Sequence, residues 1–151
     1  MTLILHEHPL SSYCWKAKVA LREAGMPFET RRVEPQDEAS RAAHLARWPL
    51  GKMPVLEDAA RGRFIPETSI IIEYVQAFHA PGAGLIPADP EAALRVRLLD
   101  RVFDSYVMEP MSRIVAENFR GGEDPVGVAQ ADAALARSYD WLETELAGRA
   151  W

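Results

Sequence analysis

The amino-acid sequence predicts an α/β domain followed by an all-helical region. Over residues 1–78, short apolar runs alternate with apolar residues at helical spacing, in the order β-α-β-α-β-β-α. Residues 79–90 are rich in proline and glycine and predict a linker, and residues 91–151 carry helical patterns only. Because the first two strands flank a helix, they are expected to be parallel, with a right-handed crossover.

Local patterns define each element of the first domain. The first apolar run has the length of a buried strand, and Pro9 ends it. Gly25 and Pro27 end the first helix, since glycine suits the residue after a helix and proline cannot continue one. Residues 58–62 form a hairpin-length connection that contains glycine. The expected strands are residues 2–6, 28–33, 54–57 and 63–65, and the expected helices are residues 13–24, 39–47 and 67–78.

Two long helices are expected in residues 91–151. Apolar residues mark one face of the first helix from Leu94 to Met111, and Pro110 is expected to bend it. In the second helix, apolar residues from Val128 to Leu146 are spaced 3, 4, 4, 3 and 4 apart, which is an amphipathic stripe. A pair of glycines, residues 121–122, separates the two helices.

Composition and charge exclude several classes of function. With 17 Lys and Arg against 22 Asp and Glu, the net charge of −5 argues against general nucleic-acid binding, which needs clustered cations. Cys14 is the one cysteine, so the chain has no intrachain disulfide and no thiolate zinc site, and no metal is expected. A free thiol, the lack of a signal peptide and the lack of an apolar membrane span together predict a cytoplasmic protein.

The segment Ser11-Ser-Tyr-Cys14 joins the first strand to the first helix. A helix N-terminus presents unpaired N–H groups and a partial positive charge, which stabilise a thiolate of the protein or of a ligand. A serine hydroxyl there can donate a hydrogen bond to that sulfur. Taken alone, however, the segment is more simply interpreted as a helix cap formed by Ser11 or Ser12.

Two further segments have the chemistry to bind a small peptide. A cis bond between Met53 and Pro54 would turn the Met53 backbone outward, where its N–H and C=O can pair with an extended peptide. Pro66 precedes a helix start at which backbone N–H groups and the Thr68 hydroxyl can bind a carboxylate, and Glu67 can hold an ammonium group. Each segment by itself is more often an ordinary strand start or helix cap.

Together, the three segments resemble the glutathione transferase superfamily. The order is a strand, a serine turn and a helix ending in Gly-x-Pro-Phe-Glu, then Pro-x-Gly-Lys-x-Pro-Val-Leu, then Glu-Thr-x-x-Ile-x-x-Tyr, and the spacings also match. The resemblance covers residues 1–78 and implies a thioredoxin-like N-terminal domain that binds glutathione. Members usually continue for several more helices, so the resemblance implies an incomplete all-α C-terminal domain in residues 91–151.

The resemblance implies roles for individual residues in the first domain. Ser11 matches the catalytic serine of Ser-type classes such as zeta, theta and tau. The Met53 backbone, before a cis Pro54, would pair with the cysteinyl part of glutathione. The remaining implied glutathione-binding residues are Lys52 for the glycyl carboxylate and Glu67 with Thr68 for the γ-glutamyl end.

For the second substrate, the resemblance implies a pocket for a small apolar electrophile, lined by Tyr106, Met108 and Met111. Core packing is the competing interpretation of these three side chains. The resemblance also implies a homodimer, with glutathione as co-substrate.

Three functions stay open at this point. The first is a transferase in which Ser11 and the helix N-terminus lower the pKa of the bound glutathione thiol. The second is thiol–disulfide exchange through Cys14, which takes the place of the second cysteine in a Cys-x-x-Cys motif. The third is a module that binds glutathione without catalysis, because a fold can persist when its chemistry is lost.

Overall fold

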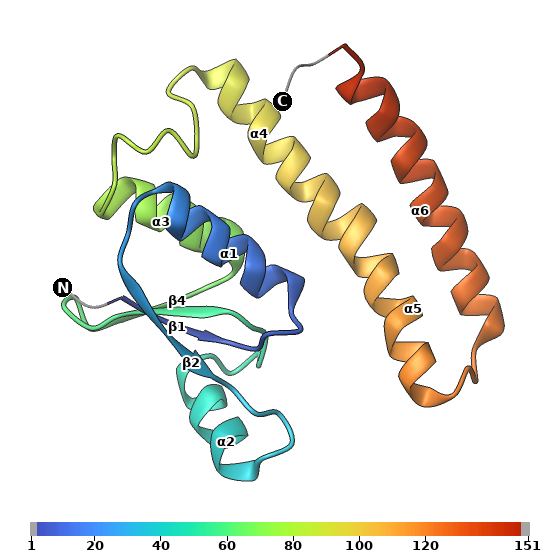
Figure 1. The fold of residues 1–151 in the computed structure, drawn as a ribbon, viewed down its shortest axis with the longest axis horizontal. Coiled ribbons are helices and arrows are strands. Elements are labelled where there is room, and N and C mark those ends of the chain that lie inside the picture. Colours follow the sequence, from blue (N-terminus) through green and yellow to red (C-terminus); the bar gives the residue numbers. More distant parts are fainter. Residues whose placement is uncertain (1–2, 149–151) are drawn as a thin grey trace. The chain divides into compact units, whose positions relative to one another are not determined.

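The structure is a computed structural model that describes residues 3–148 of the 151-residue chain. The chain divides into two compact units, Met1–Asp89 and Pro90–Trp151 (Figure 1). The first unit is a mixed α/β structure and the second is helical, which confirms the predicted fold class.

Within the described residues, the first unit contains a four-stranded sheet in the order β2-β1-β3-β4. β1 pairs with β2 in parallel, as predicted for two strands that flank a helix, and the other pairings are antiparallel. The expected second strand ends one residue early, although the Val33 N–H still donates to the Glu7 carbonyl at 2.8 Å. The strands are β1 (Leu3–Glu7), β2 (Phe28–Arg32), β3 (Val55–Asp58) and β4 (Arg63–Pro66).

Three helices of the described chain belong to this unit: α1 (Ser12–Glu23), α2 (Glu38–Arg47) and α3 (Thr68–Phe78). Figure 1 shows α1 and α3 together on one side of the sheet and α2 on the other. The core lies between the sheet and helices α1 and α3. Alternate residues of a strand point to the same face of the sheet, so every second strand residue can reach this core. Leu3, Leu5 and Leu56 of the sheet pack there with residues of α1 and α3 such as Leu21 and Ile71.

A buried carboxylate ties the end of β3 to the end of α3. The Tyr74 hydroxyl donates to Asp58 Oδ2 at 2.8 Å, and His79 Nε2 lies 2.8 Å from the same oxygen. Burial opposes ionisation of Asp58, but hydrogen bonds from Tyr74, the Arg61 backbone and His79 outweigh it and hold the pKa of the carboxyl below its ordinary value. His79 therefore belongs to the packed domain, although the sequence assigns it to the linker.

The helical unit differs from prediction in its first helix. A π-helical segment, η1 (Phe103–Met108), interrupts the expected continuous helix before Pro110. Proline has no N–H to donate back to the preceding turn, and the Tyr106 carbonyl, four residues before it, instead accepts a hydrogen bond from Ser138 Oγ at 2.9 Å. A widened turn of this kind accommodates the missing bond. The α-helices of the unit are α4 (Pro90–Val102), α5 (Glu109–Arg120) and α6 (Pro125–Leu146).

The second of the two predicted helices corresponds to α6 and follows the predicted pattern. α5 ends at Gly121, whose φ of 93° lies in the left-handed region that glycine tolerates. Asp124 then caps α6 by accepting a hydrogen bond from the Gly127 N–H at 2.8 Å. Along the predicted stripe of α6, Ala131 and Leu142 are buried, whereas Tyr139 remains 49% exposed. No helix formed by residues 3–148 combines the length and the apolar character that crossing a membrane requires.

Candidate functional site

Ser11 lies at the N-cap of α1, directly after the turn that leaves β1. Its Oγ accepts a hydrogen bond from the Cys14 N–H at 3.3 Å, and its own N–H donates to the His8 carbonyl at 3.0 Å. A hydroxyl that accepts a bond in this way keeps its proton for a second partner. The capping role and the proposed sulfur-binding role of Ser11 are therefore compatible.

The start of α1 favours an anion. The first turn contains no acidic side chain that would offset the partial positive charge of the helix N-terminus. Ser11 is half-buried, so a group bound there would be partly shielded from water. The first condition stabilises a thiolate next to the serine hydroxyl, whereas shielding from water by itself favours the neutral thiol.

The loop before β3 is held from beneath by a buried histidine. The Met53–Pro54 peptide bond is cis, as the resemblance implied. His44 of α2 is 3% exposed, and its Nε2 lies 3.1 Å from the Lys52 carbonyl oxygen. The Lys52 side chain is exposed and Met53 is half-buried. His44 thus fixes the backbone that presents both residues, and sequence reasoning missed it because no local pattern pairs residue 44 with residue 52.

Glu67 adopts an uncommon backbone conformation at the start of α3. Its φ is 66°, a region that non-glycine residues rarely occupy. The predicted helix therefore begins one residue later, at Thr68, because a residue with positive φ cannot form part of an α-helix. Strained residues of this kind concentrate at ligand sites. Glu67 is exposed, whereas Thr68 is 5% exposed.

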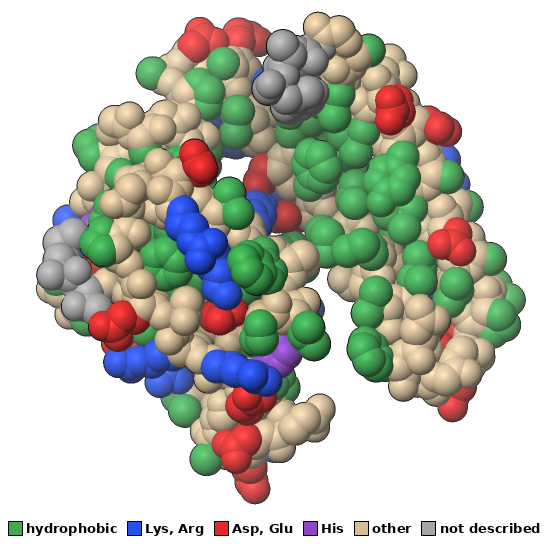
Figure 2. Space-filling model, in the orientation of Figure 1, with side chains coloured by type: hydrophobic (Ala, Val, Ile, Leu, Met, Phe, Trp, Pro, Cys, Tyr) green, Lys and Arg blue, Asp and Glu red, His purple; other side chains and the backbone are tan. Residues whose placement is uncertain are grey.

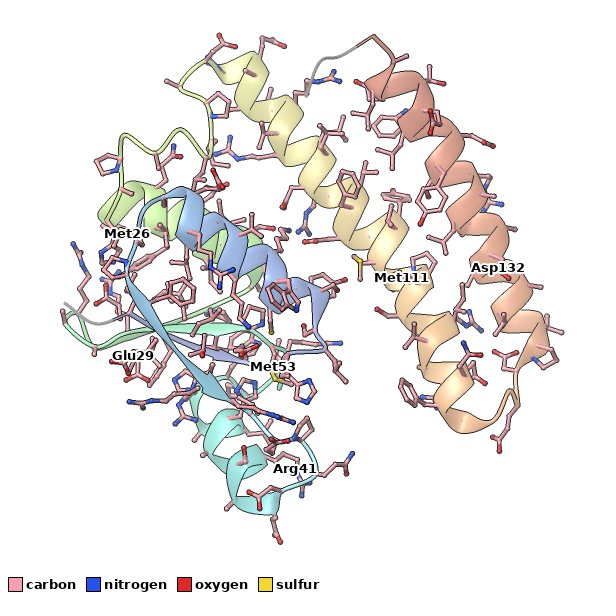
Figure 3. All side chains as sticks on the ribbon, viewed as in Figure 1. Met26, Glu29, Arg41, Met53, Met111 and Asp132 are labelled. Carbon is pink, nitrogen blue, oxygen red and sulfur yellow. The ribbon has the colours of Figure 1, made fainter. Side chains whose placement is uncertain are left out.

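Strand register brings the three segments to one edge of the sheet. His6 near the end of β1 lies opposite Val55, the first residue of β3, and Val55 lies opposite Pro66, the last residue of β4. The Ser11 turn follows the first of these positions, Met53–Pro54 precedes the second, and Glu67 follows the third. Figure 3 shows Met53 at the end of the sheet where β1 passes into α1.

The three residues predicted to contact the second substrate differ in their surroundings, because only one of them lines a groove. Tyr106 is 61% exposed and lines a groove of about 490 Å³ in the helical unit. Met108 and Met111 are half-buried, and neither lines that groove. Figure 2 shows hydrophobic side chains gathered over α4 and α6 on the face in view. Further residues that line the groove are Leu98, Val102, Pro110, Ala134, Ser138 and Trp141.

Cys14 does not have the surroundings of a reactive thiol. Its side chain is fully buried, and this burial raises the pKa of the thiol, although hydrogen bonds with Ser11 and the His8 backbone act in the opposite direction. A protonated, inaccessible sulfur is a poor nucleophile. The environment argues against thiol–disulfide exchange through Cys14. In the part of the chain that the structure describes, no three His, Cys, Asp or Glu side chains gather as a metal site.

Comparison with known sequences identifies the relatives of this chain. A family model for the glutathione S-transferase N-terminal domain matches residues 5–82. A glutathione S-transferase of Pseudomonas putida is 36% identical over 142 residues, which make up 93% of this chain and 62% of that protein. Glutathione S-transferase 4 of Zea mays is 40% identical over 73 residues, 48% of this chain and 32% of that protein. The chain spans less than two thirds of the length of both relatives.

Solved structures agree with this comparison. A glutathione S-transferase of Methylobacterium radiotolerans, in complex with glutathione sulfonate, matches with a TM-score of 0.87 and 25% identity over 100% of this chain and 70% of that one. One from Methylobacillus flagellatus with glutathione bound matches with a TM-score of 0.87 and 27% identity over 99% of this chain and 72% of that one. Since the family model covers just over half of the sequence and the fold agrees, this chain belongs to the glutathione S-transferase family.

Proposed function

We propose that this chain binds reduced glutathione at the Ser11 edge of the sheet and transfers it to a small apolar electrophile. The convergence of the Ser11 turn, the Met53–Pro54 loop and the Glu67–Thr68 helix start at one sheet edge carries the proposal. Two relatives of known structure hold glutathione or its sulfonate, which supports the same ligand here.

Glutathione has three chemically distinct parts, and each finds a suitable partner. Its γ-glutamyl end carries an ammonium and a carboxylate, which suit the exposed Glu67 side chain and the N–H groups with the Thr68 hydroxyl at the start of α3. The extended cysteinyl part pairs with the Met53 backbone, as one strand pairs with another. The exposed Lys52 ammonium can form an ion pair with the glycyl carboxylate.

The reaction requires a thiolate at neutral pH. A free thiol has a pKa of about 8.5, so only a small fraction is ionised in solution. The Ser11 hydroxyl donates its proton in a hydrogen bond to the sulfur, and the uncompensated N-terminus of α1 adds a favourable dipole. Both stabilise the ionised form, so the thiol proton leaves to solvent. The sulfur then forms a C–S bond with the electrophile, whose leaving group departs with the electrons of the broken bond, as chloride does from a chlorinated substrate.

For the electrophile, we assign Tyr106, Met108 and Met111 as the contacting side chains. Tyr106 offers an exposed aromatic side chain, and Met108 and Met111 follow it in the sequence as half-buried, adaptable side chains. Methionine side chains adjust to ligands of different shape, which suits a broad range of small apolar compounds.

The same proposal includes a homodimer that acts in the cytoplasm. Exposed apolar side chains such as Leu50 at 72% and Ile70 at 55% are available for contact with a second copy. The free and buried Cys14 suits a reducing compartment. Light scattering of the purified protein tests the oligomeric state, and a monomer at micromolar concentration would contradict that part of the proposal.

The test measures binding and turnover separately. Calorimetric titration with reduced glutathione at neutral pH is expected to show saturable binding that Thr68→Val weakens by about tenfold, because valine keeps the shape but removes the hydroxyl donor. Conjugation of 1-chloro-2,4-dinitrobenzene then measures turnover. Binding without turnover would leave a glutathione-binding module, and no binding by a folded protein would overturn the proposed function.

A further inference from the structure

A buried ion pair joins β1 to α1, the two elements that the Ser11 turn connects. Glu7 is the last residue of β1 and Lys18 lies in the middle of α1, and their side-chain oxygen and nitrogen are 2.9 Å apart. Only 6% of Glu7 and 7% of Lys18 is exposed. Charged groups are rarely buried to this degree in proteins unless they are paired. The pair therefore holds two opposite charges in the interior between β1 and α1.

Trp15 contacts both the Lys18 ammonium and the turn before α1. The Lys18 nitrogen lies 4.6 Å from the centre of the indole ring, in cation–π contact. The Trp15 Nε1–H donates to the Pro9 carbonyl at 2.8 Å. Because Pro9 belongs to the turn that ends at Ser11, the position of the turn and the position of the charge pair depend on each other.

The pair acts on the Cys14 thiol, which lies one helical turn from Ser11. Cys14 is the sulfur-containing residue nearest to Ser11 in the sequence, and its N–H donates to the Ser11 hydroxyl at 3.3 Å. Both charges act on its thiol: Glu7 raises its pKa and Lys18 lowers it. The two effects oppose each other at this thiol. The other ionisable side chains on the turn, on α1 and on the adjacent α3 include His8, Lys16, Arg22, Glu23, Glu67 and Glu73.

We infer that Glu7 and Lys18 are positioning residues that balance the charge in the interior between β1 and α1, so that the Lys18 ammonium cancels the buried Glu7 carboxylate and the site accepts a thiolate. The inference rests on the proposed function, since the thiolate in question is that of bound glutathione. Loss of Lys18 leaves an unpaired carboxylate that repels the thiolate, and loss of Glu7 leaves an unpaired ammonium that attracts it. A residue needed only for packing would not produce effects of opposite sign.

The experiment is an absorbance titration of the thiolate of glutathione bound to the full chain, near 240 nm. Lys18→Met is expected to raise the pKa of the bound thiol by about one unit, and Glu7→Gln is expected to lower it by about as much. At pH values below the pKa, this changes the thiolate fraction about tenfold in each direction. The double variant is expected to return close to the wild-type value, because it removes both charges.

Two variants control for the loss of charge itself. Arg22→Met and Glu23→Gln remove the same charges from the exposed end of α1, and neither is expected to move the titration. If Lys18→Met does not fold, the double variant is compared with Glu7→Gln alone, and the double variant is expected to have the higher pKa by about one unit. Shifts of the same sign in the two single variants, no shift, or a double variant equal to Glu7→Gln would overturn the inference.

Failure of the proposed function is recognised separately. If the wild-type protein binds no glutathione, the proposed function fails, and the same titration is applied to the Cys14 thiol of the same variants. That thiol faces both charges and needs no ligand. Opposite shifts of the Cys14 titration in Lys18→Met and Glu7→Gln would then support the charge balance, and unchanged titrations would overturn it.

Discussion

Asp58 Oδ2 and His79 Nε2 lie 2.8 Å apart, and both side chains are fully shielded from solvent. The contact joins the last residue of β3 to the residue that follows α3, so it holds the end of this inner strand against the end of the helix. Asp58→Asn removes the negative charge of the carboxylate that His79 and the Tyr74 hydroxyl both contact. We expect this variant to lose about 3 kcal/mol of unfolding free energy at neutral pH, measured by urea denaturation. The exposed Glu29→Gln is the charge-matched control, and an equal loss in both variants would contradict the role of Asp58.

The contribution of Asp58 to stability depends on pH with a defined sign. Its pKa in the folded protein lies below the ordinary value of 3.8, because hydrogen bonds from Tyr74, Arg61 and His79 overcome the effect of burial. The stabilisation is therefore present above the unfolded pKa and is lost as the pH falls through the folded pKa. The difference in stability between wild type and Asp58→Asn is expected to shrink below about pH 4. A difference that grows on acidification would reverse the assignment.

Ser11→Ala tests the proposed thiolate-stabilising hydroxyl. We expect kcat with a dinitrobenzene electrophile to fall about a hundredfold, because one donor to the developing charge is lost. The dissociation constant for glutathione should change by less than about threefold, since the other contacts remain. Loss of the helix cap should also cost about 1 kcal/mol of stability. Ser11→Thr keeps a hydroxyl and serves as the conservative control, and unchanged turnover in Ser11→Ala would show that another group activates the sulfur.

His44→Ala tests the support beneath the glutathione loop. The change removes the 3.1 Å partner of the Lys52 carbonyl, and losing one such hydrogen bond costs about 0.5–1.5 kcal/mol. We expect glutathione affinity to fall about tenfold through the displaced Met53 backbone, as measured by calorimetry. His44→Gln retains an N–H donor of similar reach and should recover part of the affinity. Equal affinities in all three proteins would show that the loop holds its shape without His44.

Gly127→Ala tests the cap of α6 in the helical unit. A Cβ at this position would overlap the side chains of Asp124 and Arg113. These two side chains form a 2.8 Å contact, and Asp124 also accepts from the Gly127 N–H. We expect a lower melting temperature, because the added carbon displaces the capping carboxylate. Ala133→Gly, at an exposed position within the same helix, measures the ordinary effect of exchanging these two residues. If Gly127→Ala melts at the wild-type temperature, the cap adapts without loss.

Cys14 reactivity separates the transferase from the redox alternative. The thiol is buried and its pKa is raised by that burial. We expect the native protein to react with a thiol reagent at least about a hundredfold more slowly than the same protein in denaturant. Cys14→Ala is expected to keep its transferase activity. Rapid reaction of native Cys14 would return thiol–disulfide exchange to consideration.

Local signals allowed much of the fold to be predicted. Apolar periodicity and the glycine and proline positions gave the order of strands and helices in the first unit, with boundaries that differ from the structure by only one or two residues. The helix start at residue 67 was wrong by one residue, because the positive φ of Glu67 is a response to its surroundings and has no sequence signal. The π-helical segment was also missed, since Pro110 predicts a disturbance but not the form it takes.

By itself, the sequence determined which residue types stand at the Ser11 turn, at Met53–Pro54 and at Glu67–Thr68, because caps, turns and helix starts are encoded within a few neighbouring positions. Only the tertiary structure decided that these segments meet at one sheet edge and which buried groups support them. Asp58 contacts His79, which is 21 residues away in the sequence, and His6 contacts Glu57, which is 51 residues away. Pairings over such distances follow from strand register and burial, which no short stretch of sequence specifies.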